Sequence, residues 1–247
     1  MKFVFDIDGT ICFDYTDLSQ EAMQLLDLIE DQGHEVIFAS ARPIRDMVPV
    51  IKDKYQHHRL IGANGAMVSI NNEVIDMCHF SADIKASLLE LLKRYEAIFL
   101  ADGAWDYHYN GDGSHELMKY VNAGELAKND SLENLGDIMK IVVFEANDLE
   151  GLMQEIAALD LSFRQHPSTL SVDIVACHTN KFEALKKQGI TDYVAMGNDI
   201  NDKEMLAHAT VSIMIDHHDD LHELVDHKVA YDENYLDNLK AIFAPYL

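Results

Sequence analysis

The sequence is poor in basic residues and has no long apolar run. It carries 19 Lys and Arg against 43 Asp and Glu in 247 residues, a formal net charge of −24. Nucleic acids and anionic membranes bind through clustered Lys and Arg, so we expect neither as a partner. A membrane-spanning helix needs about eighteen consecutive apolar residues, and no such run occurs. The acids within MKFVFDIDG argue against a secretory signal, so we expect a cytoplasmic protein.

Cysteine pairs and common metal-binding spacings are also missing. Cys12, Cys78 and Cys177 lie far apart and form no CxxC pair, so we expect free thiols rather than a zinc site or a disulfide framework. The 13 histidines are scattered, without HExxH or similar spacing. A small phosphorylated ligand remains compatible with so acidic a chain. A few well-placed bases or a metal ion must then capture it against the field of the whole protein.

Strands and helices alternate at both ends of the chain. Residues 3–7 are typical of a short buried strand, and residues 19–32 have apolar residues at helical spacing, with Ser19 as N-cap and Gly33 as stop. This alternation predicts an α/β fold with a Rossmann-like parallel sheet. We expect further strands at 35–39, 59–62, 170–175, 192–197 and 211–215, and further helices at 44–55, 180–188 and 202–209.

The middle of the chain has a different character. Residues 80–167 combine helix-like segments at 81–95 and 148–159 with several strand-like ones, which predicts a small α+β cap domain. We expect it to be inserted into a core formed by residues 1–79 and 168–247. The two connections, at 77–80 and 165–168, would form a paired hinge, with Pro167 fixing a turn. Trp105, Tyr107 and Tyr109 alternate, which favours one packed face of a cap strand over a lining for the substrate.

Polar groups follow the predicted core strands, where open α/β sheets bind ligands. Carboxylate and amide oxygens suit Mg²⁺, and cations and hydroxyls suit phosphoryl oxygens, so the set indicates a magnesium and phosphate site. The members are Asp6, Asp8, Gly9 and Thr10 after the first strand, Ser40, Ala41 and Arg42 after the second, Lys181 at a helix start, and Asn198, Asp199, Asn201 and Asp202 after 192–197.

The spacing of Asp6 and Asp8 fits a divided catalytic task. Residues two apart on a strand point to the same face, so both carboxylates can flank one reaction centre. One can attack phosphorus while the other handles a proton on the leaving group. Gly9 lets the backbone turn so that amides face a phosphate. A divalent cation would relieve the repulsion between the two acids.

Four motifs in order resemble those of the haloacid dehalogenase-like hydrolases. DIDGT at 6–10 resembles the family's DxDGT, Ser40 in FASARP its second motif, Lys181 in NKFEAL its third, and GNDINDKEML from Gly197 its fourth. ANGA at 63–66, ahead of the inserted block, is similar to the Cof-type subgroup, which has a large cap at the second insertion position.

The resemblance implies roles for these residues. Asp6 would be the nucleophile that forms an aspartyl-phosphate, and Asp8 the general acid and base. Ser40 and Lys181 would hold the phosphate, and Asn201 would contact it. Thr10, Ala41 and Arg42 would bind the phosphate or substrate, with an ion pair as the alternative for Arg42. Mg²⁺ would be bound by Asp6, Asp8 through its backbone carbonyl, Asn198 and Asp202, with orientation of Lys181 as the alternative for Asp202.

One position departs from the family pattern. The family usually has Asp where this chain has Asn198, and a neutral amide brings no charge to the metal. We therefore expect weaker Mg²⁺ binding. The adjacent Asp199 could substitute, although a capping or surface role fits it better.

The sequence predicts a Mg²⁺-dependent phosphatase that acts on a small phosphorylated metabolite, such as a sugar phosphate, as a monomer or homodimer. A phosphotransferase of the phosphomutase type remains open, and Asn198 leaves open a binding or regulatory protein with little turnover. A receiver domain would also place acids over Mg²⁺. The long chain, the cap block and Lys181 with GNDIND argue against it.

Overall fold

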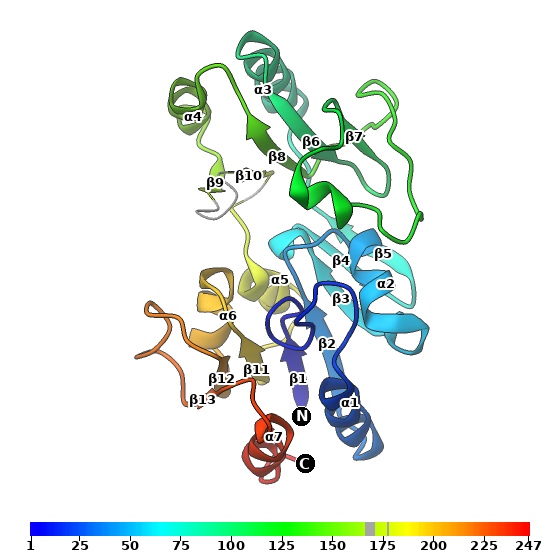
Figure 1. Ribbon diagram of the computed structural model, residues 1–247, viewed down its shortest axis with the longest axis vertical. Helices are drawn as coiled ribbons and strands as arrows, with labels where there is room; N and C mark the ends of the chain where they lie inside the picture. Colours follow the sequence, from blue (N-terminus) through cyan, green and yellow to red (C-terminus); the bar gives the residue numbers. More distant parts are fainter. Residues whose placement is uncertain (166–170, 177) are drawn as a thin grey trace. The chain divides into compact units, whose positions relative to one another are not determined.

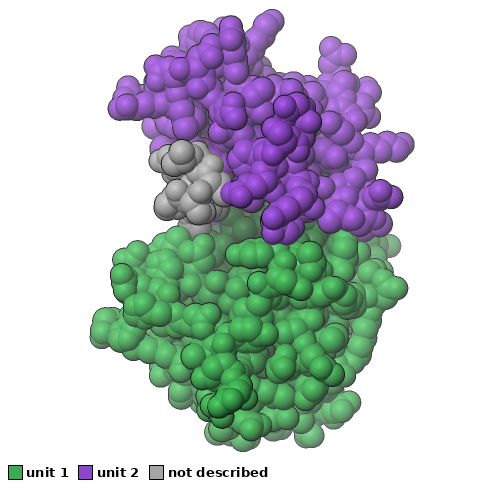
Figure 2. All heavy atoms as spheres, viewed as in Figure 1, with its two compact units in different colours: residues 1–75, 180–247 green, residues 76–179 purple. Residues whose placement is uncertain are grey.

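A computed structural model describes residues 1–165, 171–176 and 178–247 of the chain. They form two compact units (Figure 2). The first unit contains Met1–Ile75 and Asn180–Leu247, and the second contains Asp76–Thr179. The turn predicted at Pro167 lies outside the described residues.

A mostly parallel sheet forms the centre of the first unit (Figure 1). Among the described residues it has eight strands in the order β13-β12-β11-β1-β2-β3-β4-β5. Neighbours from β13 to β3 run parallel, and β3 pairs antiparallel with β4. The strands are β1 (Lys2–Phe5), β2 (Glu35–Ala39), β3 (Arg59–Gly62), β4 (Met67–Ile70), β5 (Glu73–Met77), β11 (Val194–Gly197), β12 (Val211–Ile215) and β13 (His227–Val229).

Helices cover both faces of this sheet. On one face the ring of Phe3 meets Phe243 of α7 at 5.1 Å, and Phe38 meets Tyr55 of α2 at 5.9 Å. On the other face Val4 belongs to a buried cluster with residues of α5 and α6. The alternating side chains of each strand therefore fill two cores. The helices are α1 (Gln20–Asp31), which packs against α7, then α2 (Ile44–Tyr55), α5 (Lys181–Lys187), α6 (Lys203–Ala207) and α7 (Tyr235–Phe243).

The order of the strands sets the place of the site. From β1 the chain builds outward through β2 and β3, and after the second unit it returns on the other side through β11, β12 and β13. The direction of winding reverses between β1 and β11. The carboxyl ends of such strands flank a crevice, which is where doubly wound sheets bind ligands.

The second unit is an antiparallel sheet with two helices. Its strand order is β7-β6-β8-β10-β9, and one buried cluster joins the sheet to α3 and α4. The elements are α3 (Ala82–Arg94), β6 (Ile98–Asp102), β7 (Tyr107–Tyr109), β8 (Lys140–Glu145), α4 (Leu149–Ala157), β9 (Ser162–Gln165) and β10 (Val172–Val175). Together the two sheets confirm the predicted fold class.

The predicted position of the second crossing between the units is wrong. Residues 170–175 were expected in the core sheet, but β10 pairs antiparallel with β8 and β9. The chain therefore leaves the second unit at Thr179, and enters it at Asp76. The run LSVDIV satisfies the local requirements of either sheet, so only long-range pairing decides where it belongs. The elements β4, β5, β13 and α7 were not predicted.

The cysteines also differ from expectation. Cys12 is a buried free thiol, as expected, but Cys78 is disulfide-bonded, so the prediction of free thiols is wrong there. Cys177 lies outside the described residues. None of the described helices combines the length and apolar composition that crossing a membrane requires.

Ser19 is the residue at which the predicted N-cap of α1 can be tested. Its hydroxyl accepts a hydrogen bond from the backbone N–H of Ala22 at 3.0 Å, which confirms the predicted N-cap of α1. We expect Ser19→Ala to lower the free energy of unfolding by about 1 kcal/mol, because one N–H of the first turn loses its acceptor. Urea titration monitored by circular dichroism measures the change. Ser19→Asp should retain wild-type stability, and an Ala variant as stable as Asp would contradict the capping role.

Candidate active site

A buried lysine lies between two carboxylates at the ends of β1 and β11. Lys181 Nζ donates to Asp6 Oδ1 at 2.5 Å and to Asp202 Oδ1 at 2.6 Å. Lys181 and Asp202 are fully buried, and Asp6 is 4% exposed. Residues that are far apart in the sequence thus form one chain of charge-assisted hydrogen bonds.

Local structure fixes each member of this chain. The N–H of Asp6 donates to Met196 O at 3.0 Å, which continues the pairing of β1 with β11. Lys181 opens α5 directly after Asn180, whose side chain caps the helix through the N–H of Glu183. Asp202 Oδ2 accepts from the backbone N–H groups of residues 198 and 199 at 3.0 and 3.1 Å. Both oxygens of Asp202 are therefore occupied by protein donors.

Burial changes the acidity of these groups. Burial and the charge of Asp202 raise the pKa of Asp6 to about 7, although Lys181 opposes the shift. Burial would lower the pKa of Lys181, but Asp202 and Asp6 outweigh it, and the pKa rises above its ordinary value. The lysine thus stays charged at neutral pH, whereas Asp6 titrates in that range unless another cation lies nearby.

Asp8 is held by Arg42 from the end of β2. Arg42 Nε donates to Asp8 Oδ2 at 2.8 Å and Nη2 donates to Oδ1 at 2.6 Å, a two-pronged contact. The same guanidinium donates to Tyr15 O at 2.8 Å. The ion-pair alternative at Arg42 therefore describes the observed geometry. To exchange a proton with a substrate, Asp8 must give up part of this contact.

Thr10 links Asp6 to the loop after β11. Its hydroxyl lies 3.0 Å from Asp6 Oδ2, to which it donates, and 3.3 Å from Asn198 Oδ1. Gly9 has φ +76°, and a Cβ there would lie 2.1 Å from Asn198 Nδ2. The turn therefore requires glycine for its backbone conformation and for space. Tyr235, which the sequence did not single out, donates its hydroxyl to Thr10 O at 2.7 Å.

Two further polar residues predicted for the site, Ser40 and Asn201, follow β2 and β11. Ser40 is 1% exposed, and its Oγ accepts from the N–H of Arg42 at 3.1 Å, with Ala41 half-buried between them. Asn201 Nδ2 donates to Asn64 Oδ1 at 3.3 Å, while Asn201 Oδ1 is buried without a hydrogen-bond partner. An unpartnered buried amide oxygen is rare and marks a place where a ligand or water can bind. Asn64 lies in the quoted ANGA motif, but nothing local predicts its contact with Asn201.

The oxygen donors in this region suit a hard divalent cation. Asp6 offers a carboxylate, Asp8 a backbone carbonyl and Asn198 an amide oxygen at one edge of the sheet, the ligand type that Mg²⁺ prefers. The carboxylate of Asp202 accepts three hydrogen bonds, from Lys181 and from two backbone N–H groups. Asp199 forms a capping box with Asp202 and lies 3.5 Å from His218 Nε2, which confirms its expected capping role. The donor set therefore fits the implied metal without Asp199 or Asp202.

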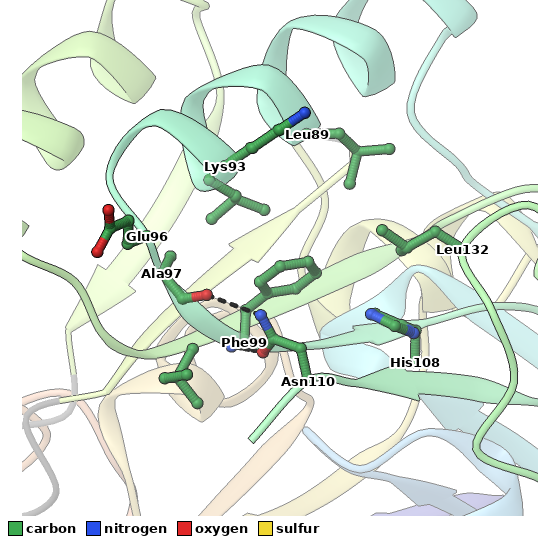
Figure 3. A pocket seen from close by; sticks show the side chains of 10 residues that line it. Leu89, Lys93, Glu96, Ala97, Phe99, His108, Asn110 and Leu132 are labelled. Atoms are coloured by element: carbon green, nitrogen blue, oxygen red, sulfur yellow. Dashed lines mark hydrogen bonds between the residues drawn. The ribbon is translucent and has the colours of Figure 1, made fainter.

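The second unit has a pocket of its own beside α3 and β6 (Figure 3). It encloses about 500 Å³, and its polar lining includes His108 and Asn110. The amide of Asn110 forms hydrogen bonds with the backbone: its Oδ1 accepts from the N–H of Phe99, and its Nδ2 donates to Ala97 O. The ring of His108 on β7 lies 5.7 Å from that of Phe99 on β6, on the face of the sheet that lines the pocket. Tyr107 and Tyr109 pack on the opposite face with Val142 and Phe144. The expected packed face is thereby confirmed for the two tyrosines. Trp105 is 38% exposed and donates its indole N–H to Leu126 O at 2.7 Å, so the packed face is not confirmed for this residue.

The raised pKa of Asp6 predicts a pH-dependent stability. The folded protein holds a proton on Asp6 between about pH 4 and about pH 7, where the unfolded chain has released it. In EDTA the wild type should therefore lose stability as the pH rises through this window and change little from this group above it. Asp6→Asn should lack this component, and Asp8→Asn should keep it. Urea midpoints between pH 4 and 8 measure it, and parallel curves for wild type and Asp6→Asn would contradict the assignment.

Comparison with known proteins identifies the family and agrees with the resemblance of the four sequence motifs. The family model of haloacid dehalogenase-like hydrolases matches residues 3–234. YitU of Bacillus subtilis (strain 168), a 5-amino-6-(5-phospho-D-ribitylamino)uracil phosphatase, is 24% identical over 223 residues, which cover 83% of this chain and 82% of YitU.

Solved structures share the fold. A haloacid dehalogenase-like hydrolase from Bacteroides thetaiotaomicron aligns with a TM-score of 0.80 at 17% identity, over 98% of this chain and 99% of the other. The HAD subclass IIB sugar phosphatase BT4131 aligns with a TM-score of 0.76 at 18% identity, over 98% of both chains. With four motifs in the family's order and a family model matching residues 3–234, the chain belongs to the haloacid dehalogenase-like hydrolases.

Proposed function

We propose that this protein is a Mg²⁺-dependent phosphatase that hydrolyses a small phosphomonoester through an aspartyl-phosphate on Asp6. The observation that carries the proposal is the buried Asp6–Lys181–Asp202 chain, with Asp8 two residues away on the same strand end. A carboxylate beside a buried ammonium group is suited to attack a phosphoryl group, because the ammonium offsets charge on the transferring oxygens.

The residues divide the reaction into two balanced steps. A carboxylate oxygen of Asp6 bonds to phosphorus while the ester oxygen leaves and takes a proton from Asp8. Asp8, now ionised, then accepts a proton from water as the water oxygen attacks phosphorus. The Asp6–phosphorus bond breaks, and inorganic phosphate leaves. Lys181 and the Ser40 hydroxyl would bind phosphoryl oxygens in both steps. The Nδ2 group of Asn201, which donates to Asn64 Oδ1 in this structure, would donate a further hydrogen bond to them.

Mg²⁺ would be held by the side chains of Asp6 and Asn198 and by the backbone carbonyl of Asp8, and it would supply positive charge opposite the transferring phosphoryl group. Asp202 then has the task of orienting Lys181, since its oxygens already accept from Lys181 and two backbone N–H groups. Arg42 would break one of its two hydrogen bonds to Asp8 as a substrate oxygen binds, so that this carboxylate becomes available for proton transfer.

We further propose that the second unit acts as a cap and selects the leaving group. YitU acts on a phosphorylated ribityl compound and BT4131 is a sugar phosphatase, so a phosphorylated sugar or polyol is the class to test first. The strands of the second unit carry a buried ion pair, Lys140–Asp173 at 2.8 Å, which the sequence did not single out.

Asp6→Asn tests the nucleophile. The substitution keeps the size of the side chain and removes the attacking charge, so kcat should fall by about three orders of magnitude or more. Phosphate release from a panel of sugar and polyol phosphates with excess Mg²⁺ is the measurement. Asp192→Asn, a matched change at the partner of the Thr210 hydroxyl, should retain activity. Near-normal turnover by a folded Asp6→Asn protein would refute the proposal.

Asn198 tests the metal site. A neutral amide leaves the shell one negative charge short of the family pattern, so Asn198→Asp should lower the Mg²⁺ concentration needed for half-maximal activity, by about tenfold. Asp199→Asn should change that concentration little, because Asp199 caps the following turn. If Asp199→Asn abolishes the response to Mg²⁺ and Asn198→Asp leaves it unchanged, Asp199 is the ligand. If neither moves it, the metal is held elsewhere.

A further inference from the structure

Three potential metal ligands meet in the first unit, apart from the candidate active site. Glu30 lies in the last turn of α1, and His57 and His58 lie between α2 and β3. One ligand atom from each lies within 4.8 Å of the other two. Among the described residues, no other group of His, Cys, Asp and Glu meets this spacing. Spacing along the sequence does not indicate this group, because Glu30 is far from the two histidines along the chain.

Glu30 and His58 lie close together. His58 Nε2 is 2.8 Å from Glu30 Oε1, as in an ion pair. Two ligands of one Zn²⁺ ion, with bonds of about 2.0–2.2 Å, lie about 3 Å apart. The spacing of these two atoms therefore also fits two ligands of one ion.

The histidines are held in place before any ion binds. The N–H of His58 donates to Tyr55 O at 3.1 Å, and His57 O accepts from the N–H of Asn71 at 3.1 Å. The His58 ring stacks on Tyr55 at 5.8 Å, and it lies 6.1 Å from the ring of Phe38. Such fixed neighbours reduce the entropy that the side chains lose when an ion binds.

We propose that Glu30, His57 and His58 bind a divalent transition-metal ion such as Zn²⁺ or Ni²⁺. Two imidazoles and one carboxylate are a ligand set for these borderline ions, whereas Mg²⁺ selects oxygen atoms alone. His57 is exposed, so water can complete the coordination shell. The site is independent of the proposed phosphatase reaction, and bound metal would join the end of α1 to the start of β3.

The surrounding charges favour a cation here. α1 ends in Glu30 and Asp31 and has no basic residue in its last turn, so its negative dipole end lacks an internal counter-charge. Lys54 is the local competitor. Its Nζ lies 3.7 Å from Glu30 Oε2 and also donates to Asp27. Because the Lys54 side chain is 54% exposed, it can turn to solvent when a metal ion enters.

Calorimetric titration of ZnCl₂ into the full-length protein tests the site. Excess Mg²⁺ in the buffer occupies oxygen-rich sites. The wild type should bind one Zn²⁺ ion. Glu30→Gln and the double variant His57→Asn/His58→Asn should bind it at least about tenfold more weakly, because loss of a residue that only supports a metal ligand already weakens binding by that factor. The matched control is His217→Asn/His222→Asn, a second histidine pair, exposed at His217 and half-buried at His222, whose rings lie 5.4 Å apart. It should bind Zn²⁺ as the wild type does.

Thermal unfolding gives a second readout. Zn²⁺ should raise the unfolding temperature of the wild type and of the control, but not that of Glu30→Gln, because only a folded site binds the ion. Glu30→Gln keeps the side-chain volume, and circular dichroism verifies its fold independently of the histidine variant. Wild-type affinity in either site variant would overturn the proposal, as would loss of binding in the His217/His222 control.

Discussion

The Lys181 ammonium group, fixed between Asp6 and Asp202, is the interaction on which the site depends. Taking these charges out of water costs several kcal/mol per ion, and only close pairing with further hydrogen bonds offsets that cost. Lys181 supplies the pairing, and the backbone N–H groups of residues 198 and 199 satisfy Asp202. The chain of contacts joins β1, α5 and the loop after β11. Loss of one partner would leave a buried charge unpaired, which typically destabilises by about 3–5 kcal/mol.

Two carboxylates around one ammonium group also leave a local excess of negative charge. That excess contributes to the pKa of about 7 at Asp6. A cation next to Asp6 would favour its ionised form, which is the form that can attack phosphorus. Arg42 already forms an ion pair with Asp8. In the proposed reaction, metal binding and ionisation of Asp6 would therefore support each other, even though the net charge of −24 opposes a phosphorylated ligand.

Patterns that act locally were predictable from the sequence. The N-cap at Ser19, the strand 211–215 and the gathering of Asp6, Lys181 and Asp202 follow from spacing, capping and the rule that ligands bind at strand ends. Contacts that depend on long-range pairing were not. β10 joined the second unit because its partners are β8 and β9, and no local feature of LSVDIV excludes either sheet.

Side-chain contacts between distant segments were equally hidden. The hydroxyl of Tyr235 and the amide of Asn64 reach the loops of the site, but neither residue carries a recognisable signal in its own neighbourhood.

Trapping the acyl-phosphate on Asp6 in a single turnover tests the central claim most directly. Borohydride reduces such an intermediate to homoserine, and mass spectrometry of the peptides should find homoserine at position 6. Phosphate release with unmodified Asp6 and homoserine at position 8, or phosphate on another residue, would contradict the account.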